Sequence, residues 1–124
     1  MNRLSRDQYT TVLDPKLQPA MTITSGEELV VETWDAYMGV WGAHEQPTVM
    51  GPATGPIAIE GANAGDALKV EILAITPGPS ALHDIRAGRG FLGDEFTIRH
   101  PTVMPIRDGH LELPGGLRVP VNPS

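Results

Sequence analysis

Residues 25–35 read S-G-E-E-L-V-V-E-T-W-D and predict a turn followed by a strand. Gly26 opens the turn, and Leu29–Val31 supply an apolar, β-branched run of the kind that strands favour. This strand carries Glu32 and Asp35 to its far end, next to a glycine-rich break. Two carboxylates at the end of a buried strand cost free energy unless something binds or protonates them. The stretch is therefore the first candidate for a functional site.

The same pattern returns at residues 64–72, which read A-G-D-A-L-K-V-E-I. The two copies keep a constant offset, and their matching pairs are Gly26 and Gly65, Glu27 and Asp66, Leu29 and Leu68, Val31 and Val70, and Glu32 and Glu71. A repeated turn-and-strand unit predicts two similar strand pairs in one β-structure. Two ordinary strands that each follow a glycine turn would give the same pattern, so this alternative stays open.

Length and composition narrow the class of protein. A chain of 124 residues predicts a single domain, 1–124, and aromatic residues at only 5% predict an aliphatic core. The net charge of −6 argues against nucleic acid or an anionic membrane as a partner. No apolar run approaches the ~20 residues of a membrane-spanning helix.

The chain contains no cysteine, which excludes disulfides and thiolate metal sites. The N-terminal residues M-N-R-L-S-R-D-Q-Y lack the apolar core of a signal peptide. Both observations fit a reducing compartment, and we expect a cytoplasmic protein.

The 14 glycines and 12 prolines are spread along the chain and leave no window for a long helix. Strands are expected at 8–12, 19–24, 28–34, 57–60, 67–75, 95–98, 102–106, 110–113 and 117–119. The prediction is an all-β chain, a sandwich or barrel with short strands and long Gly/Pro-rich loops.

Two of those loops call for comment. Residues 36–56 form a long irregular segment, which in a compact domain is usually functional. Residues 88–93 match the dinucleotide-binding pattern G-x-G-x-x-G, but that fingerprint needs a strand before it and a helix after it. Here a Gly/Pro loop precedes and a strand pattern follows, so we interpret 76–93 as loop.

Glu32 and Asp35 lie three residues apart, which places them on opposite faces of a regular strand. They converge only if the chain bends between them. A functional interpretation makes them a metal ligand and a general acid or base. The alternative is a solvated strand end with ordinary surface carboxylates, and the spacing leaves both open.

Other candidate groups lie in the irregular segment. None of the four histidines has zinc-site spacing, and His44, beside Glu45, is the most site-like. Thr54 and Gly55 could present a hydroxyl and backbone N–H groups to a bound anion or carbonyl, although a tight turn would look the same.

Several stretches together resemble one family, the acetamidase/formamidase amide hydrolases. They are E-T-W-D-A at 32–36, T-G-P-I at 54–57, E-G-A at 60–62 and G-D-A-L-K-V at 65–70, in the family's order and spacing. The resemblance extends over the chain, with one departure at Gly51, where the family pattern has Asn before the proline. The family pattern also continues beyond residue 124, so the resemblance implies an N-terminal portion or subunit.

The resemblance implies a β-sandwich and hydrolysis of the C–N bond of small linear, or even cyclic, amides such as formamide and acetamide. It implies Glu32 and Asp35 as catalytic residues, and a divalent metal, expected to be zinc, with Asp35 and His44 among its ligands and the rest mostly in a missing C-terminal half. Trp34, Thr54 and Gly55 would bind the amide substrate, with Tyr37 and Trp41 adding an apolar wall.

The partner implied is a C-terminal amidase chain in a hetero-oligomer that self-associates further. The alternative function is a non-catalytic β-domain that binds a partner chain or a small carbonyl ligand.

Overall fold

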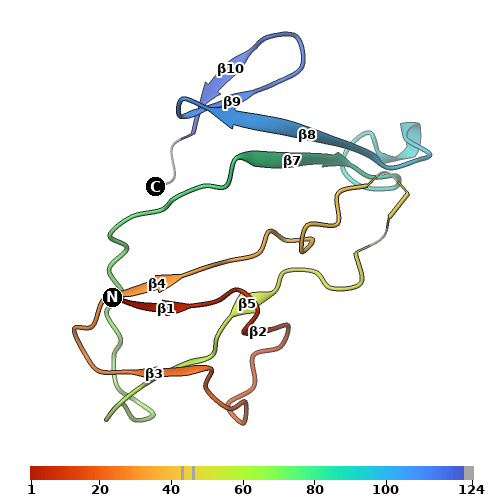
Figure 1. Cartoon of the computed structure of the whole chain (residues 1–124). Helices are drawn as coiled ribbons and strands as arrows, with labels where there is room; N and C mark the ends of the chain where they lie inside the picture. The colour runs from red at the N-terminus through yellow and green to blue at the C-terminus, as the bar shows by residue number, and fades with distance from the viewer. Residues whose placement is uncertain (43, 46, 122–124) are drawn as a thin grey trace. The chain divides into compact units, whose positions relative to one another are not determined.

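The chain folds almost entirely into short β-strands (Figure 1). The computed structural model describes residues 1–42, 44–45 and 47–121. The strands are β1 (Asn2–Leu4), β2 (Tyr9–Thr10), β3 (Met21–Ile23), β4 (Leu29–Val31), β5 (Ala53–Thr54), β6 (Ile57–Ile59), β7 (Ser80–Ile85), β8 (His100–Arg107), β9 (His110–Glu112) and β10 (Arg118–Pro120). One 3₁₀ turn, η1 (Gly93–Glu95), interrupts them, and no α-helix occurs among the described residues. The all-β prediction is confirmed.

The chain divides into two compact units. The first comprises Met1–Val40 and Gln46–Leu68, and the second comprises Trp41–Glu45 and Lys69–Ser124. Within the described ranges the strands form four small sheets, none of which closes into a barrel.

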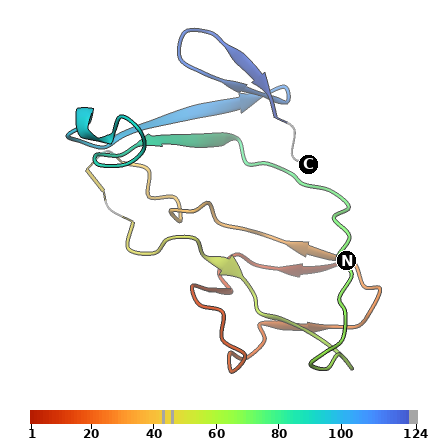
Figure 2. The same ribbon diagram turned by 180° about the vertical axis from the view of Figure 1, so that it is seen from behind.

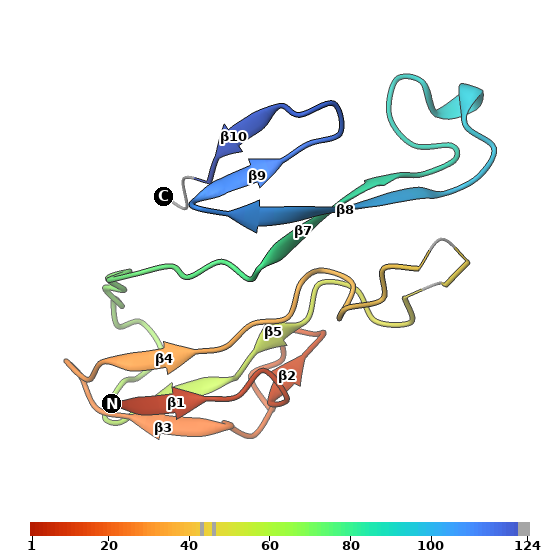
Figure 3. The same cartoon turned by 45° about the horizontal axis from the view of Figure 1, so that its top comes forward.

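In the first unit, strands pair across long stretches of sequence (Figure 3). β1 runs parallel to β4, with Leu4 opposite Val31, and β3 runs parallel to β6. β2 pairs with β5 in antiparallel orientation, with Tyr9 opposite Thr54. Leu4 is only 2% exposed, so this unit is centred on the β1–β4 pair.

The second unit holds an antiparallel sheet in the order β10-β9-β8-β7. β7 and β8 lie side by side along six paired residues (Figure 2). Asp108 and Gly109 have φ values of 48° and 69°, as a two-residue hairpin between β8 and β9 requires. Met104 on β8 is 7% exposed and is the buried apolar residue of this sheet.

Most expected strands form, and most of these are shorter than predicted, although β8 (His100–Arg107) is longer than the expected 102–106. The strand expected at 67–75 is absent: these residues carry no strand assignment and are exposed. The sequence pattern was misleading, because a run of apolar residues forms a strand only where a neighbouring strand can share backbone hydrogen bonds with it.

Two further expectations were wrong, and two strands were not predicted: β1, and β5 inside the segment 36–56 that was expected to be irregular. The predicted loop at 76–93 contains β7 (Ser80–Ile85), which forms because β8 pairs with it along its whole length. The strand expected at 95–98 is not formed, and η1 occupies its start. β1 was not predicted, because its polar sequence becomes a strand only through pairing with β4.

Candidate functional site

Glu32 directly follows β4 and is held through its main chain. Its N–H donates to the Leu4 carbonyl at 3.0 Å, and its carbonyl accepts from the Thr54 hydroxyl at 2.7 Å. Its carboxylate forms an ion pair with the Arg3 guanidinium at the surface. The residue is therefore fixed from both sides by β1 and β5, while its charged group stays partly in water.

Asp35 organises the turn that follows. One carboxylate oxygen accepts the N–H of Tyr37 and the other accepts the N–H of Gly39, each at 2.8 Å. Met38 and Gly39 both adopt positive φ, at 53° and 77°, a strained path for Met38 that the two hydrogen bonds stabilise. A carboxylate has further lone pairs, so Asp35 can still accept a proton donor or a cation.

Trp34 lies between these two carboxylates in sequence and is half-buried. The Arg6 guanidinium lies 3.8 Å from the centre of its ring, a cation–π contact. Its indole Nε1 is buried and has no hydrogen-bond acceptor among the described residues. A buried N–H without an acceptor costs about 1–3 kcal/mol, so a carbonyl oxygen brought to this position would be stabilised.

Thr54 and Gly55 use their donors within the first unit. The Thr54 hydroxyl donates to Glu32, as above, and the Gly55 N–H donates to the Gln8 carbonyl at 2.8 Å. The two groups expected to meet an anion or carbonyl thus already have acceptors, and the two residues tie β5 and its turn to the rest of the unit.

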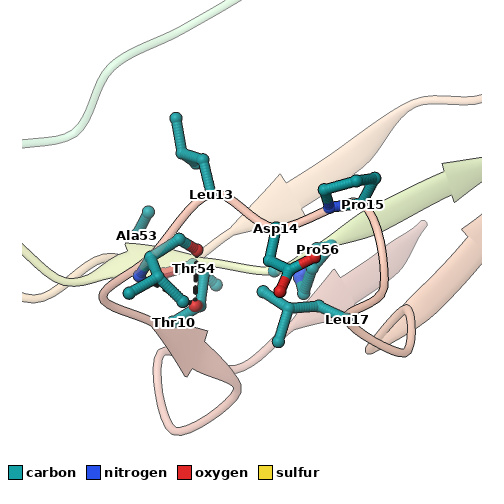
Figure 4. Close-up of a pocket in the computed structure, with 10 residues that line it drawn as sticks. Thr10, Leu13, Asp14, Pro15, Leu17, Ala53, Thr54 and Pro56 are labelled. Carbon is teal, nitrogen blue, oxygen red and sulfur yellow. Dashed lines mark hydrogen bonds between the residues drawn. The ribbon is translucent and has the colours of Figure 1, made fainter.

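Both residues also line an open cavity of about 350 Å³. Its walls are mostly apolar and include Leu13, Pro15, Leu17, Ala53 and Pro56 (Figure 4). That volume suits a small ligand. Glu32, Trp34 and Asp35 are not among its lining residues, so the cavity and the end of β4 are distinct places on the first unit.

His44 is exposed and belongs to the second unit, whereas Asp35 belongs to the first. Within the described ranges, no group of three or more His, Asp or Glu side chains could hold a metal ion. The described residues therefore do not make a complete metal site by themselves. The expected metal and its two ligands stay a prediction.

Of the two aromatic residues expected to form an apolar wall, Tyr37 is in the first unit and Trp41 in the second. Both are half-buried. The indole Nε1 of Trp41, like that of Trp34, is buried with no acceptor in the described part of the chain.

Sequence reasoning missed an ionic cluster in the second unit. The side chain of Asp84 on β7 is 4% exposed, and its carboxylate accepts from Nε of Arg86 and from Nε of Arg99, both at 2.9 Å. Arg99 also donates to the carbonyls of Gly42 and Glu45, at 3.1 and 2.8 Å. The cluster connects Gly42 and Glu45 to Asp84 on β7.

Two opposing effects act on the Asp84 carboxyl. Burial alone would raise its pKa, but the hydrogen bonds and charges of Arg86 and Arg99 together outweigh burial, so the pKa is lowered from 3.8. The carboxylate is thus ionised whenever the unit is folded near neutral pH. The only signal in the sequence is the Asp84-x-Arg86 alternation, and nothing there indicates Arg99.

No helix in the described part of the chain is long and apolar enough to cross a membrane. No protein-family model and no curated protein matches the chain.

Solved structures do match it. An acetamidase from Bacillus halodurans is 29% identical over 95% of this chain, with a TM-score of 0.86. A predicted acetamidase/formamidase from the thermophile Thermoanaerobacter tengcongensis is 31% identical over 96% of this chain, with a TM-score of 0.88. In both cases this chain spans only 42% of the matched chain, less than half its length.

Proposed function

Because this chain resembles the N-terminal portion of acetamidase/formamidase structures, as its motifs predicted, we propose that it supplies part of an enzyme that hydrolyses small amides. The main support is the similarity to the two solved structures, with TM-scores of 0.86–0.88 and sequence identities of 29–31% across nearly the whole chain. The rest of such an enzyme would come from a further polypeptide segment or chain, in a hetero-oligomer.

The proposed site is the end of β4. Asp35 would orient or deprotonate the attacking water, because two backbone N–H groups hold its carboxylate in one position. Glu32 would serve as a second acid or base, its charge balanced by Arg3 until the substrate or the rest of the enzyme displaces that partner. Trp34 Nε1 would donate to the carbonyl oxygen of the amide.

Thr54 and Gly55 would act on the substrate indirectly. The Thr54 hydroxyl holds the carbonyl of Glu32, so a role in binding would come through the position of that residue.

A divalent metal, expected to be zinc, would polarise the amide carbonyl when bound. Asp35 and His44 are its proposed ligands on this chain. Most of its other ligands would come from the rest of the enzyme, because the described residues do not complete a set of three.

The test is reconstitution. The chain is co-expressed with the part of the Thermoanaerobacter tengcongensis protein that it does not cover, and ammonia release from formamide and acetamide is measured. We expect activity from the assembly, and a loss of at least about 100-fold in kcat for Asp35→Ala and Glu32→Ala with the assembly intact. The exposed Asp94→Ala is the matched control and should retain activity.

The alternative function is a non-catalytic β-domain that binds a partner. Its support is that both carboxylates already have partners within the chain: Glu32 has Arg3, and Asp35 has two N–H groups. An intact assembly whose activity is unchanged by both alanine substitutions would remove the two residues from catalysis and favour this alternative.

A further inference from the structure

The segment 68–75, L-K-V-E-I-L-A-I, is the most exposed apolar stretch of the chain's described part. Its five large apolar side chains are between 52% and 68% exposed: Leu68, Val70, Ile72, Leu73 and Ile75. None of its residues is assigned to a strand. A run of this length and hydrophobicity left in water is unusual for a folded surface and indicates an interaction site.

Its pattern is that of a buried strand. In a strand, Leu68, Val70 and Ile72 would share one face, and Leu73 and Ile75 would lie on the other. Strands with apolar residues on both faces are covered on both sides in folded proteins. The only charged residues of the segment are Lys69 and Glu71. Lys69 Nζ lies 3.8 Å from Glu71 Oε2, and the two charges sum to zero.

The first copy of the repeat shows what this pattern does when a neighbour is present. Leu29–Val31, which match Leu68–Val70, form β4 because β1 lies parallel to them. The second copy has the same spacing after its glycine turn but no paired strand. It lacks a neighbour, and its central residue is Lys69 where the first copy has the stronger strand former Val30.

We propose that residues 68–75 are a docking strand, which becomes part of a β-sheet when the remaining portion of an acetamidase/formamidase fold adds a strand to it. The occupant is the polypeptide that corresponds to the more than half of each matched chain without a counterpart here. The inference rests on the proposed assembly and names the surface through which it forms.

Two observations favour this occupant over a second copy of the chain. The only buried large apolar residues in the described part are Leu4 and Met104, too few for a chain that completes its own core. The net charge of −6 makes identical copies repel each other, whereas it leaves a different partner free to carry the opposite charge.

Hydrogen exchange followed by mass spectrometry tests the proposal directly. The probe is the uncovered part of the Thermoanaerobacter tengcongensis protein, co-expressed with the full 124-residue chain. In the chain alone, amides 68–75 should exchange at nearly the rate of an unstructured peptide. In the complex they should slow by at least about 100-fold, because strand hydrogen bonds must open first.

Substitutions provide the second measurement. Val70→Lys and Ile72→Lys should each weaken the complex by about 10- to 100-fold, because each places a charge where an apolar side chain would be buried. Phe91→Lys is the matched control. Phe91 is fully exposed in a glycine-rich loop, so this variant should bind the partner as tightly as the unchanged chain does.

Three results would overturn the proposal. They are the absence of a complex with the unchanged chain, a complex in which amides 68–75 exchange as fast as before, and a homodimer of the chain alone that protects these amides. Ammonia release is a separate readout: protection without activity would keep the docking strand and remove the proposed catalysis.

Discussion

The two copies of the turn-and-strand pattern share their glycine turn and the spacing of Leu, Val and Glu, but only the first copy forms a strand. In the first copy, Leu29–Val31 form β4 and pair with β1. In the second, Leu68–Val70 and the residues after them carry no strand and lie exposed. The comparison separates strand preference, which both copies have, from strand formation, which only the copy with a neighbour achieves.

The largest difference in stability should appear when a leucine is truncated at each copy: Leu4, which lies opposite the first copy, and Leu68, which belongs to the second. Leu4→Ala removes the buried residue opposite Val31 and should lower the free energy of unfolding by about 2–5 kcal/mol. Leu68→Ala should change it by less than about 0.5 kcal/mol in the isolated chain. Urea denaturation measures both, and equal effects would mean that the second copy is packed in solution.

The second unit contains most of the exposed copy, and it is stabilised by the ion pairs of Asp84 with Arg86 and Arg99. Asp84→Asn should cost about 2–3 kcal/mol, because it weakens two hydrogen bonds to charged donors at a 4% exposed site. Exposed Asp94→Asn is the control. No loss in Asp84→Asn would show that residues 41–45 are held by other contacts.

The same anchor predicts a pH dependence. The folded pKa of Asp84 is lowered from 3.8, so its contribution is present above the unfolded pKa and is lost as the pH falls through the folded value. Unfolding followed between pH 6 and pH 2, roughly spanning this range, should show a loss in the natural chain below about pH 4 that Asp84→Asn reduces. Identical profiles would contradict the assignment.

A smaller effect on stability is expected from the hydrogen bond between Thr54 and Glu32, which holds the end of the first copy. Thr54→Val removes the hydroxyl that donates to the Glu32 carbonyl at 2.7 Å, and should cost about 1 kcal/mol. Urea denaturation measures this loss, and the exposed Thr97→Val should be neutral in the same assay. A neutral Thr54→Val would mean that water replaces the hydroxyl.

The smallest effect should be at the paired glutamates of the two copies. Glu32→Gln weakens the ion pair with Arg3 and should cost less than about 1 kcal/mol, diminishing in high salt. Glu71→Gln, whose pair with Lys69 is more exposed, should be within the error of measurement. A larger effect at Glu71 would indicate that residues 68–75 have structure in the free chain.

Local signals in the sequence predicted much of the fold. The strands around Met21–Ile23, Leu29–Val31 and Ile57–Ile59 follow from short apolar runs next to turn residues. The Asp108-Gly109 hairpin follows from its turn chemistry. Such features depend on neighbours in sequence, which a single chain displays.

What failed depends on distant partners. β1 is polar and becomes a strand only against β4, and the strand expected at 67–75 has no neighbouring strand among the residues that the structure describes. For the site, the sequence located Glu32 and Asp35 at the end of a strand. It could not show that Arg3 pairs with one and that backbone N–H groups cap the other, because those contacts come from the folded turn and from a strand it did not predict.

The long-range pairing of the first unit has a consequence for the order of folding. β3 pairs with β6, so that sheet waits until residue 59 is available, whereas the β8–β9 hairpin closes across two residues and can form within microseconds. Residues 68–75 follow residue 59 along the chain and pair with no strand in the described part, so they stay open to intermolecular aggregation even after both structures have formed. Lys69 and Glu71 interrupt this apolar run at alternate positions and so oppose aggregation.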